Sequence, residues 1–355
     1  MIKSHYKVVA VMSGTSLDGI DIVYAHYQFN NDWTFKIYNS ETLKYPKDWK
    51  DTLSQLVNKS IDELKEIDVS YSKYLATIIL DFINKNKLTT IDFVASHGHT
   101  ALHQPEEGLT LQIGNQQILC DILKTKVICD FRVQDVKLGG QGAPLVPIGD
   151  RLLFKAYSYC LNLGGFANIS FETEDERIAY DICPVNIVLN YYVKRMGLEY
   201  DDKGLIASKG EINYNVLNAL NKLSFYNEKP PKSLGLEWVE LNIFPLIESY
   251  NLQIKDVLRT FVEHSASQIA KILNKKGTNT LVTGGGAYND FLMLRIQQLS
   301  ETEIVIPNNE ILEFKEALIF GLLGVLKDRN EVNCLKSVTG ASRNHSSGKI
   351  LHPSI

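Results

Sequence analysis

Small polar residues gather between two apolar runs near the start of the chain. The stretch "KVVAVMSGTSLDGIDIVY", residues 7–24, carries two glycines, two serines, a threonine and an aspartate at its centre. A hairpin turn needs only two to five residues and a glycine where φ is positive. Backbone N–H groups of a glycine-rich turn can form an anion nest, and Thr15 and Ser16 would add hydroxyl donors. The loop therefore predicts a phosphate-binding hairpin, with an ordinary polar turn as the alternative.

Two further glycine clusters follow apolar runs later in the chain. "YCLNLGGFANISFE", at 159–172, repeats the strand, glycine loop and strand of the opening, and "NTLVTGGGAYN", at 279–289, is a strand that enters a glycine cluster and a helix. Each cluster alone is weak, because many tight turns look the same. Together they predict two hairpins that hold a polyphosphate and a third cluster against the base or ribose. The predicted nucleotide-binding residues are Gly14, Thr15, Ser16, Leu17, Asp18, Gly19, Ile20, Asp21, Gly164, Gly165, Asn168, Gly284, Gly285 and Gly286.

This use of glycine resembles the actin, hexokinase and Hsp70 superfamily. The resemblance implies an α/β fold of two duplicated ribonuclease H-like (actin-like ATPase) lobes with an ATP cleft between them, and ATP with Mg²⁺ as the bound cofactors. That superfamily commonly has an aspartate before its first glycine, whereas Ser13 holds this place here and Asp18 comes later. The magnesium ligand therefore stays open, with Asp18 as a candidate.

The rest of the chain supplies the elements that must position these loops. We expect a third strand at "WTFKIYNSETLKY", helical structure from Trp49 to Asn86, and a buried strand in "TIDFVASHGHT" that ends in a polar loop. "LQIGNQQILCDILKTKVICDFR" is expected as a helix and then a strand, with further helices around 205–223 and 255–276. We expect residues 1–132 and 336–355 to form the first lobe and 133–335 to form the second.

Polar side chains that could bind an acceptor cluster in two places. His97, His99 and His103 lie in "SHGHTALHQP", and their spacing favours donors to sugar hydroxyls over a metal site. Asp130, Arg132 and Asp135 form either a surface ion-pair set or an oxygen-rich ligand site. Asp181 ends an apolar strand before a proline, where a carboxylate either caps a turn or is presented into a cleft.

Composition limits the class of protein. The chain has 355 residues, 45% of them hydrophobic, which suggests two domains, and its net charge of −4 offers no basic surface for nucleic acid. Its five cysteines contain no CxxC pair, which fits a reducing compartment. The most apolar stretch, at 317–326, is too short for a membrane span. We expect a cytoplasmic protein, in a homodimer, with no membrane or nucleic-acid partner.

Ordered blocks along nearly the whole chain resemble the 1,6-anhydro-N-acetylmuramic acid kinase family. These blocks are "MSGTSLDGID", "SHGHT", "QIGN", "DFRVQDVKLGGQGAPLVP", "LNLGGFANIS", "PPKSLG", "TGGGAYN" and "VTGA". The resemblance implies that ATP and water open an anhydro-sugar of peptidoglycan recycling and that its 6-hydroxyl is phosphorylated. It implies Asp181 as the catalytic base, within a block that usually reads "DTGPGN". The residues expected to bind the sugar are His97, Gln112, Asp130, Arg132, Asn186 and Glu316.

The chain departs from the family pattern at four positions that we expect to surround the sugar. Cys183 and Val185 replace glycines, His99 replaces a glutamine, and Leu236 stands where "PPKSTGRE" has an arginine. Three alternatives therefore stay open: a non-catalytic nucleotide or sugar sensor, a kinase for a different anhydro-sugar, and a metal-dependent hydrolase built on the three histidines and Asp130.

Overall fold

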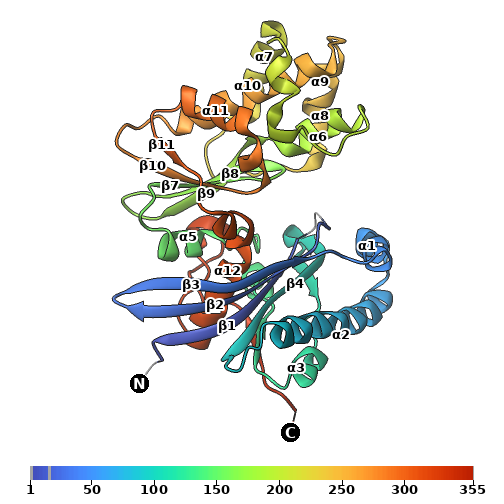
Figure 1. The fold of residues 1–355 in the computed structure, drawn as a ribbon, viewed down its shortest axis with the longest axis vertical. Coiled ribbons are helices and arrows are strands. Elements are labelled where there is room, and N and C mark those ends of the chain that lie inside the picture. The colour runs from blue at the N-terminus through green and yellow to red at the C-terminus, as the bar shows by residue number, and fades with distance from the viewer. Residues whose placement is uncertain (1–2, 15–16, 355) are drawn as a thin grey trace. The chain divides into compact units, whose positions relative to one another are not determined.

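The computed structural model describes residues 3–14 and 17–354, and the chain divides into two compact units (Figure 1). Met1–Leu153 and Phe314–Ile355 form the first unit, and Phe154–Glu313 forms the second. The sequence-based boundaries at 132/133 and 335/336 therefore differ from those of the structure. Segments 133–153 and 314–335 belong to the first unit, because their buried apolar side chains pack within it.

A mixed sheet forms the centre of the first unit. Its strand order is β12-β6-β4-β1-β2-β3, with β5 paired to β4. β1, β4 and β6 are parallel to one another, and β2 is antiparallel to both β1 and β3. The strands are β1 (His5–Ser13), β2 (Ile20–Asn30), β3 (Asp32–Leu43), β4 (Phe93–Gln104), β5 (Leu109–Ile113), β6 (Val127–Cys129) and β12 (Lys349–Leu351).

Helices cover both faces of this sheet. On one face, Leu75 and Ile79 of α2 and Leu119 of α3 share a buried core with Val9 and Val11 of β1. Ser60 begins α2 with a capping box to Glu63, which fixes the start of the longest helix. The helices of the unit are α1 (Lys47–Ser54), α2 (Ile61–Lys85), α3 (Gln117–Leu123), α4 (Val133–Lys137), α5 (Pro147–Leu153), α12 (Asn309–Asp328) and α13 (Lys336–Thr339), with short 3₁₀ turns η1 (Leu56–Asn58) and η2 (Pro105–Glu107).

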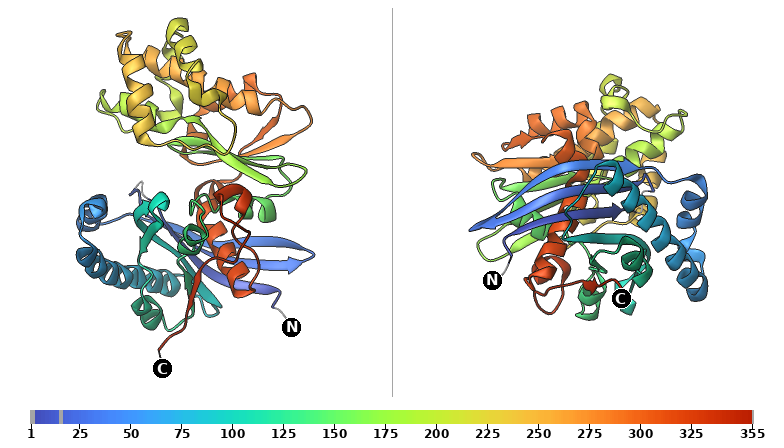
Figure 2. Two further views of the ribbon diagram at one scale, coloured as in Figure 1. Left: turned by 180° about the vertical axis from the view of Figure 1, so that it is seen from behind. Right: turned by 60° about the horizontal axis from the view of Figure 1, so that its bottom comes forward.

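α12 packs closely against the opposite face, as the rear view in Figure 2 shows. The Tyr27 hydroxyl on β2 donates to the Leu318 carbonyl at 2.6 Å. A Cβ on Gly324 would lie 2.8 Å from the Phe93 ring and 3.0 Å from Ala95, both on β4. Glycine at this position lets the helix backbone approach the sheet. None of the described helices is long and apolar enough to cross a bilayer.

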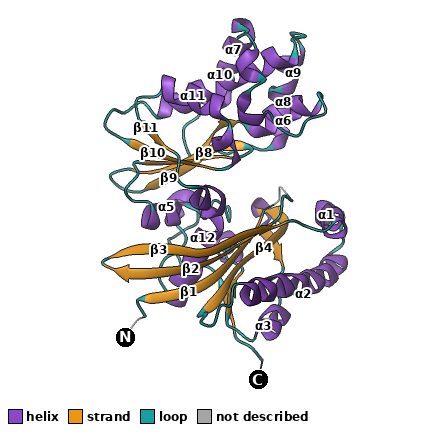
Figure 3. Cartoon of the chain, in the orientation of Figure 1, coloured by secondary structure: helices purple, strands orange, loops and turns teal. Residues whose placement is uncertain are grey.

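The second unit has one five-stranded sheet with helices over one face (Figure 3). The strand order is β11-β10-β7-β8-β9, and the core cluster joins β7, β8 and β9 to α6, α7, α10 and α11. Its strands are β7 (Tyr159–Leu163), β8 (Phe166–Glu172), β9 (Arg177–Pro184), β10 (Asn279–Thr283) and β11 (Glu303–Val305). Its helices are α6 (Asn186–Lys194), α7 (Tyr214–Asn221), α8 (Leu236–Asn242), α9 (Phe244–Glu248), α10 (Ile254–Ile272) and α11 (Asp290–Leu299), with 3₁₀ turns η3 (Asp202–Gly204), η4 (Ala207–Lys209), η5 (Ser224–Asn227) and η6 (Gly285–Tyr288).

The two sheets repeat one topology. β7, β8 and β9 form an antiparallel meander, as β1, β2 and β3 do, and β10 and β11 extend it in parallel as β4 and β6 do. The predicted α/β fold of duplicated ribonuclease H-like lobes is confirmed by this shared strand order. The duplication places the β1–β2 turn and the β7–β8 turn at equivalent positions.

Two local predictions were wrong. The histidine segment is not a loop, because β4 continues through it to Gln104 and pairs with β5. The segment predicted to begin a helix at Leu111 does not do so: residues 111–113 are the end of β5, and the helix starts only at Gln117. The other predicted strands and the predicted helical regions contain the corresponding elements.

Candidate active site

The β7–β8 turn carries glycines that the fold itself does not require. Gly164 and Gly165 both have negative φ or extended backbone, so no left-handed conformation demands glycine there. A Cβ on Gly165 would meet only Ile187, at 3.7 Å, and a Cβ on Gly164 would come no closer than 3.5 Å to its neighbours. A side chain would therefore fit at both positions. Glycine here leaves space for a group that is not part of the chain, which is what close approach of a phosphate needs.

The third glycine cluster lies beside this turn, since β10 pairs with β7. Gly284 and Gly286 are required by packing: a Cβ would lie 2.6 Å from Asn162 and 2.7 Å from Leu163, respectively, and Gly284 has φ +87°. Gly285 has no atom within 4 Å of a Cβ position and no positive φ. The fold therefore requires glycine at Gly284 and Gly286, but not at Gly285.

Asp181 lies on β9 and is held by the 230–235 loop. The Leu234 N–H donates to its Oδ2 at 2.8 Å, and the Asp181 N–H donates to the Lys232 carbonyl at 3.1 Å. Burial raises the pKa of the Asp181 carboxyl, and the Leu234 N–H partly opposes this. A carboxylate with one fixed hydrogen bond and a raised pKa is a suitable general base.

Two predicted residues flank Asp181. Asn168 is its direct cross-strand partner on β8, so the two side chains share one face of the sheet. Asn186 is the first residue of α6, and its Nδ2 donates to the Leu163 carbonyl at 3.5 Å. The Gly165 carbonyl accepts the N–H groups of Val185 and Ile187, at 2.8 and 3.2 Å. These contacts bring the β7–β8 turn, the start of α6 and the last residues of β9 together at one end of these strands.

A buried cluster of hydrogen-bonded side chains lies at the start of the β1–β2 turn. The Ser13 hydroxyl is buried and hydrogen-bonds His99 Nδ1 at 2.8 Å, the Tyr71 hydroxyl at 3.1 Å and the Tyr45 hydroxyl. Tyr45 and Tyr71 also bond each other at 2.7 Å. Burial lowers the pKa of His99 to about 4, so the ring is neutral at pH 7. The residue that replaces the superfamily's aspartate thus belongs to a closed cluster of four side chains.

The other residues of this turn have mixed environments. Thr15 and Ser16 lie outside the described residues. Gly19 is required by packing, since a Cβ would lie 2.8 Å from the Leu43 carbonyl oxygen, and Ile20 is buried in the core. Leu17 has φ +59°, and Gly14 accepts its N–H at 3.4 Å. Asp18 is exposed, and Asp21 accepts the Thr42 hydroxyl at 2.6 Å.

Three of the predicted sugar-binding residues come together in the first unit. Arg132 Nε donates to His97 Nε2 at 2.9 Å, and Arg132 NH1 donates to the Gly142 carbonyl at 2.8 Å. Because His97 Nδ1 faces the Gly98 carbonyl at 2.8 Å, the ring proton lies on Nδ1 and Nε2 accepts. Glu316 lies on α12, and its side chain is exposed. The surrounding protein still removes enough water to raise the pKa of its carboxyl, and the positive charge of Arg132 opposes that rise.

Gln112 and Asp130 form no side-chain hydrogen bond with that group among the described residues. Gln112 Nε2 donates to Thr110 at 2.9 Å, while its buried Oε1 has no partner among the described residues. Asp130 has φ +59°, which is uncommon for a residue other than glycine, and burial raises the pKa of its carboxyl. Both have unused hydrogen-bonding capacity.

Three of the four departures from the family pattern are buried, and one is exposed. Cys183 and Val185, which stand in place of the family's glycines, are fully buried and belong to the core of the second unit. His99 is buried in the Ser13 cluster. Leu236 is 45% exposed at the start of α8 and is free to face a ligand.

The three histidines do not form the metal site of a hydrolase. His97 is paired with Arg132, His99 with Ser13, and His103 Nδ1 with Thr110 at 3.0 Å. Among residues 3–14 and 17–354, the one group of His, Cys, Asp and Glu side chains close enough to share an ion is Asp135, Cys334 and His345.

The sequence reasoning also missed Tyr45, Tyr71 and Leu234, which hold site residues from distant segments and carry no local pattern.

Comparison with known proteins identifies the chain. The family model described as anhydro-N-acetylmuramic acid kinase matches residues 6–353. The anhydro-N-acetylmuramic acid kinase of Mannheimia succiniciproducens is 34% identical, over 99% of both chains, and that of Zymomonas mobilis is 32% identical, over 96% of this chain and 98% of its own. Component A of the (R)-2-hydroxyglutaryl-CoA dehydratase from Acidaminococcus fermentans is a solved structure with 10% identity and a TM-score of 0.49, covering 91% of this chain and 99% of its own.

The sequence matches define the chain as a phosphotransferase. More narrowly, it belongs to the anhydro-N-acetylmuramic acid kinase family, as its blocks of motifs predict.

Proposed function

We propose that the protein uses ATP and water to open 1,6-anhydro-N-acetylmuramic acid and phosphorylate O6, giving N-acetylmuramic acid 6-phosphate. The observation that carries this proposal is Asp181, a carboxylate with a raised pKa beside glycines that the fold does not need. Membership of the family supports the choice of sugar.

Asp181 is the general base in this reaction. It takes a proton from water as the water oxygen attacks the anomeric carbon, and the bond from that carbon to O6 breaks. The released O6 attacks the γ-phosphorus of ATP, and ADP leaves. General base catalysis contributes about 10²- to 10⁴-fold, so positioning and charge stabilisation must supply the rest.

Gly164, Gly165 and Gly285 fit a nucleotide, because each lacks a side chain for which the fold has room. Gly14, Leu17, Asp18 and Asp21 are the proposed partners from the first turn. Mg²⁺ fits an exposed carboxylate such as Asp18, where it would neutralise phosphate charge when bound. Asn168 and Asn186 would orient groups near Asp181.

Arg132, His97 and Glu316 are the proposed sugar-binding group. The Arg132 guanidinium is a donor suited to the lactyl carboxylate, and its hydrogen bonds to His97 and Gly142 fix its orientation. Gln112 and Asp130, which have unused acceptors, would bind hydroxyl or amide groups. Leu236 is the departure that leaves the identity of the sugar most open.

We place this activity in the cytoplasm, in a homodimer. The five cysteines are buried reduced thiols and not disulfide-bonded, which supports a reducing compartment. Water as a co-substrate follows from the hydrolytic opening that we propose.

Mass measurement of the products tests the proposal. The protein is incubated with ATP, Mg²⁺ and a panel of anhydro-sugars in water enriched in heavy oxygen. We expect a sugar 6-phosphate with one heavy oxygen at the anomeric carbon. A phosphorylated sugar that retains the anhydro bridge, or turnover with another anhydro-sugar alone, would contradict the proposed substrate and reaction.

A further inference from the structure

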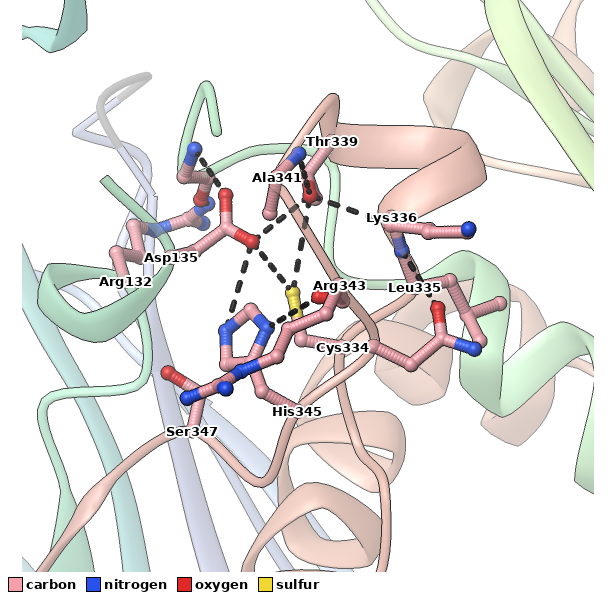
Figure 4. Close-up of polar contacts among 12 residues, drawn as sticks. Arg132, Asp135, Cys334, Leu335, Lys336, Thr339, Ala341, Arg343, His345 and Ser347 are labelled. Atoms are coloured by element: carbon pink, nitrogen blue, oxygen red, sulfur yellow. Dashed lines mark hydrogen bonds and ion pairs between the residues drawn. The ribbon is translucent and has the colours of Figure 1, made fainter. Parts of the chain in front are cut away.

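A cysteine, a histidine and an aspartate from three segments meet in the first unit (Figure 4). Asp135 comes from α4, and Cys334 and His345 come from the segment that follows α12. Their ligand atoms all lie within 4.8 Å of one another, and all three side chains are buried. We propose that these residues bind one divalent transition-metal ion of the zinc class, independently of the nucleotide and sugar sites.

The backbone holds two of the donors side by side. Cys334 and His345 form an isolated antiparallel bridge, in which each N–H donates to the other residue's carbonyl at 3.1 and 3.2 Å. Residues paired directly across such a bridge have Cβ atoms about 5 Å apart on one face. The two side chains therefore lie side by side, and both reach Asp135 Oδ1, at 3.0 Å from Cys334 Sγ and 3.5 Å from His345 Nε2.

The tautomer of His345 suits a metal. Its Nδ1 lies 3.1 Å from the Arg343 carbonyl, which can only accept, so Nδ1 carries the proton. The buried Nε2 then presents a lone pair, and it has no hydrogen-bond partner among the described residues. Metal-bound histidines typically donate their second ring N–H to a carbonyl in this way.

The unpartnered nitrogen faces a carboxylate. His345 Nε2 lies 3.5 Å from Asp135 Oδ1, beyond the normal hydrogen-bond range, and Cys334 Sγ lies 3.0 Å from the same oxygen. Two donors at about 2.0 and 2.3 Å from a tetrahedral zinc ion stand about 3.5 Å apart. The nitrogen-to-oxygen distance is thus what an ion would set, the sulfur would move outward by about 0.5 Å, and all three ligand atoms lie within 4.8 Å of one another.

Charge balance favours a divalent ion. A thiolate, a carboxylate and a neutral imidazole carry two negative charges, which one divalent ion neutralises in a site with almost no solvent exposure. Thiolate and imidazole select zinc-class ions over Mg²⁺ or Ca²⁺. The Thr339 hydroxyl, 2.8 Å from Asp135 Oδ1, and the Gly142 N–H, 2.8 Å from Oδ2, orient the carboxylate as outer partners.

Metal analysis of the full-length, untagged chain tests this site. The protein is produced with zinc, dialysed in reducing, metal-free buffer and analysed by mass spectrometry of the elements. We expect one zinc ion per chain in the wild type and in Cys120→Ser, and none in Cys334→Ser or His345→Gln. Cys120 is the matched control, a buried cysteine whose thiol also donates to an oxygen, the Thr125 carbonyl.

Cobalt gives a second measurement on the same variants. Co²⁺ bound to Cys334 should show a thiolate-to-cobalt charge-transfer band, which Cys334→Ser removes and Cys120→Ser keeps. If Cys334→Ser does not fold, the wild-type metal content and cobalt band still decide. A wild type without bound zinc or a cobalt–thiolate band overturns the site, and equal zinc in folded Cys334→Ser shows an adventitious ion only.

Discussion

The β1–β2 turn and the β7–β8 turn occupy equivalent places in the two duplicated sheets, yet they use glycine for opposite reasons. Gly19 of the first turn is required by packing, and the turn rests on the buried cluster of Ser13, His99, Tyr45 and Tyr71. Gly165 of the second turn faces open space, and its carbonyl accepts N–H groups at the start of α6. The two turns thus share a place in the strand order, but the first is anchored by buried side chains and the second has room for a side chain at Gly165.

Asp181, beside the second turn, carries the largest expected effect. Asp181→Asn keeps the size of the side chain but removes the basic oxygen, so kcat should fall by about 10²-fold or more while ATP and sugar still bind. Steady-state kinetics and calorimetry measure the two effects. Asp175→Asn, an exposed carboxylate of the same unit, is the control and should match the wild type. A kcat within a few-fold of the wild type would leave Asp181 as a structural residue.

The pH dependence of that reaction gives an independent check. The base must be ionised, and burial raises the pKa of Asp181, so kcat/KM should fall with decreasing pH through a value above the ordinary range for aspartate. Asp181→Asn should lose this acidic limb. An acidic limb that persists in the variant would assign it to another group.

Replacing Gly165 tests whether the second turn faces a ligand. Gly165→Val should fold, because a Cβ there meets only Ile187 at 3.7 Å, and should lose ATP binding because the side chain occupies the space of a phosphate. Calorimetric titration measures affinity, and circular dichroism confirms the fold. Unchanged ATP affinity in the folded variant would remove the distinction between the two turns.

The first turn should respond in stability. A Cβ in Gly19→Ala would lie 2.8 Å from the Leu43 carbonyl oxygen, so the variant should lose about 1–3 kcal/mol of unfolding free energy. Urea denaturation measures this loss, and Gly165→Ala is the matched substitution that should cost much less. Equal losses in the two variants would show that the turns are packed alike.

His99 sharpens the comparison at low pH. Its folded-state pKa of about 4 lies below the unfolded value near 6.5, so the unfolded chain binds the extra proton between these values. The contribution of the neutral His99 ring to the free energy of unfolding is fully present above pH 6.5. It is lost as the pH falls, by at most about 1.4 kcal/mol per pH unit. His99→Gln should therefore gain stability relative to the wild type between pH 6.5 and 5 in urea titrations. A constant difference across that range would mean that His99 titrates normally.

The sequence predicts the turns better than it predicts what lies beneath them. Glycines between two apolar, β-branched runs predict a hairpin. Because this pattern occurs twice in the chain, the sequence also predicts the duplicated fold. The strand in "TIDFVASHGHT" was predicted, but its continuation to Gln104 was missed. Polar residues on a buried strand need partners, here Arg132 for His97 and Ser13 for His99, that are distant in sequence. Asp135 meets Cys334 only in the folded chain, 199 positions away.

Two other features could not be predicted from the sequence: the boundary between the two units and the direction in which some side chains point. Residues 317–326 of α12 are buried throughout, so no periodic pattern shows which sheet the helix covers. Cys183 and Val185 were expected near the sugar from the family pattern, which does not show that their side chains are buried. The register shift between Ala167 and Asn168, where β8 pairs with β9, changes which residues of β9 face inward and has no local sequence signal.

The pairing of β12 with β6 has a consequence for synthesis on the ribosome. The second unit, Phe154–Glu313, is one uninterrupted segment, whereas the first needs α12 and the strand at Lys349–Leu351, which is made after the second unit. Domains generally fold as units while the chain is being made. The inserted unit can therefore complete its structure on the nascent chain, while the amino-terminal sheet waits, with one edge and one apolar face uncovered, for the final residues.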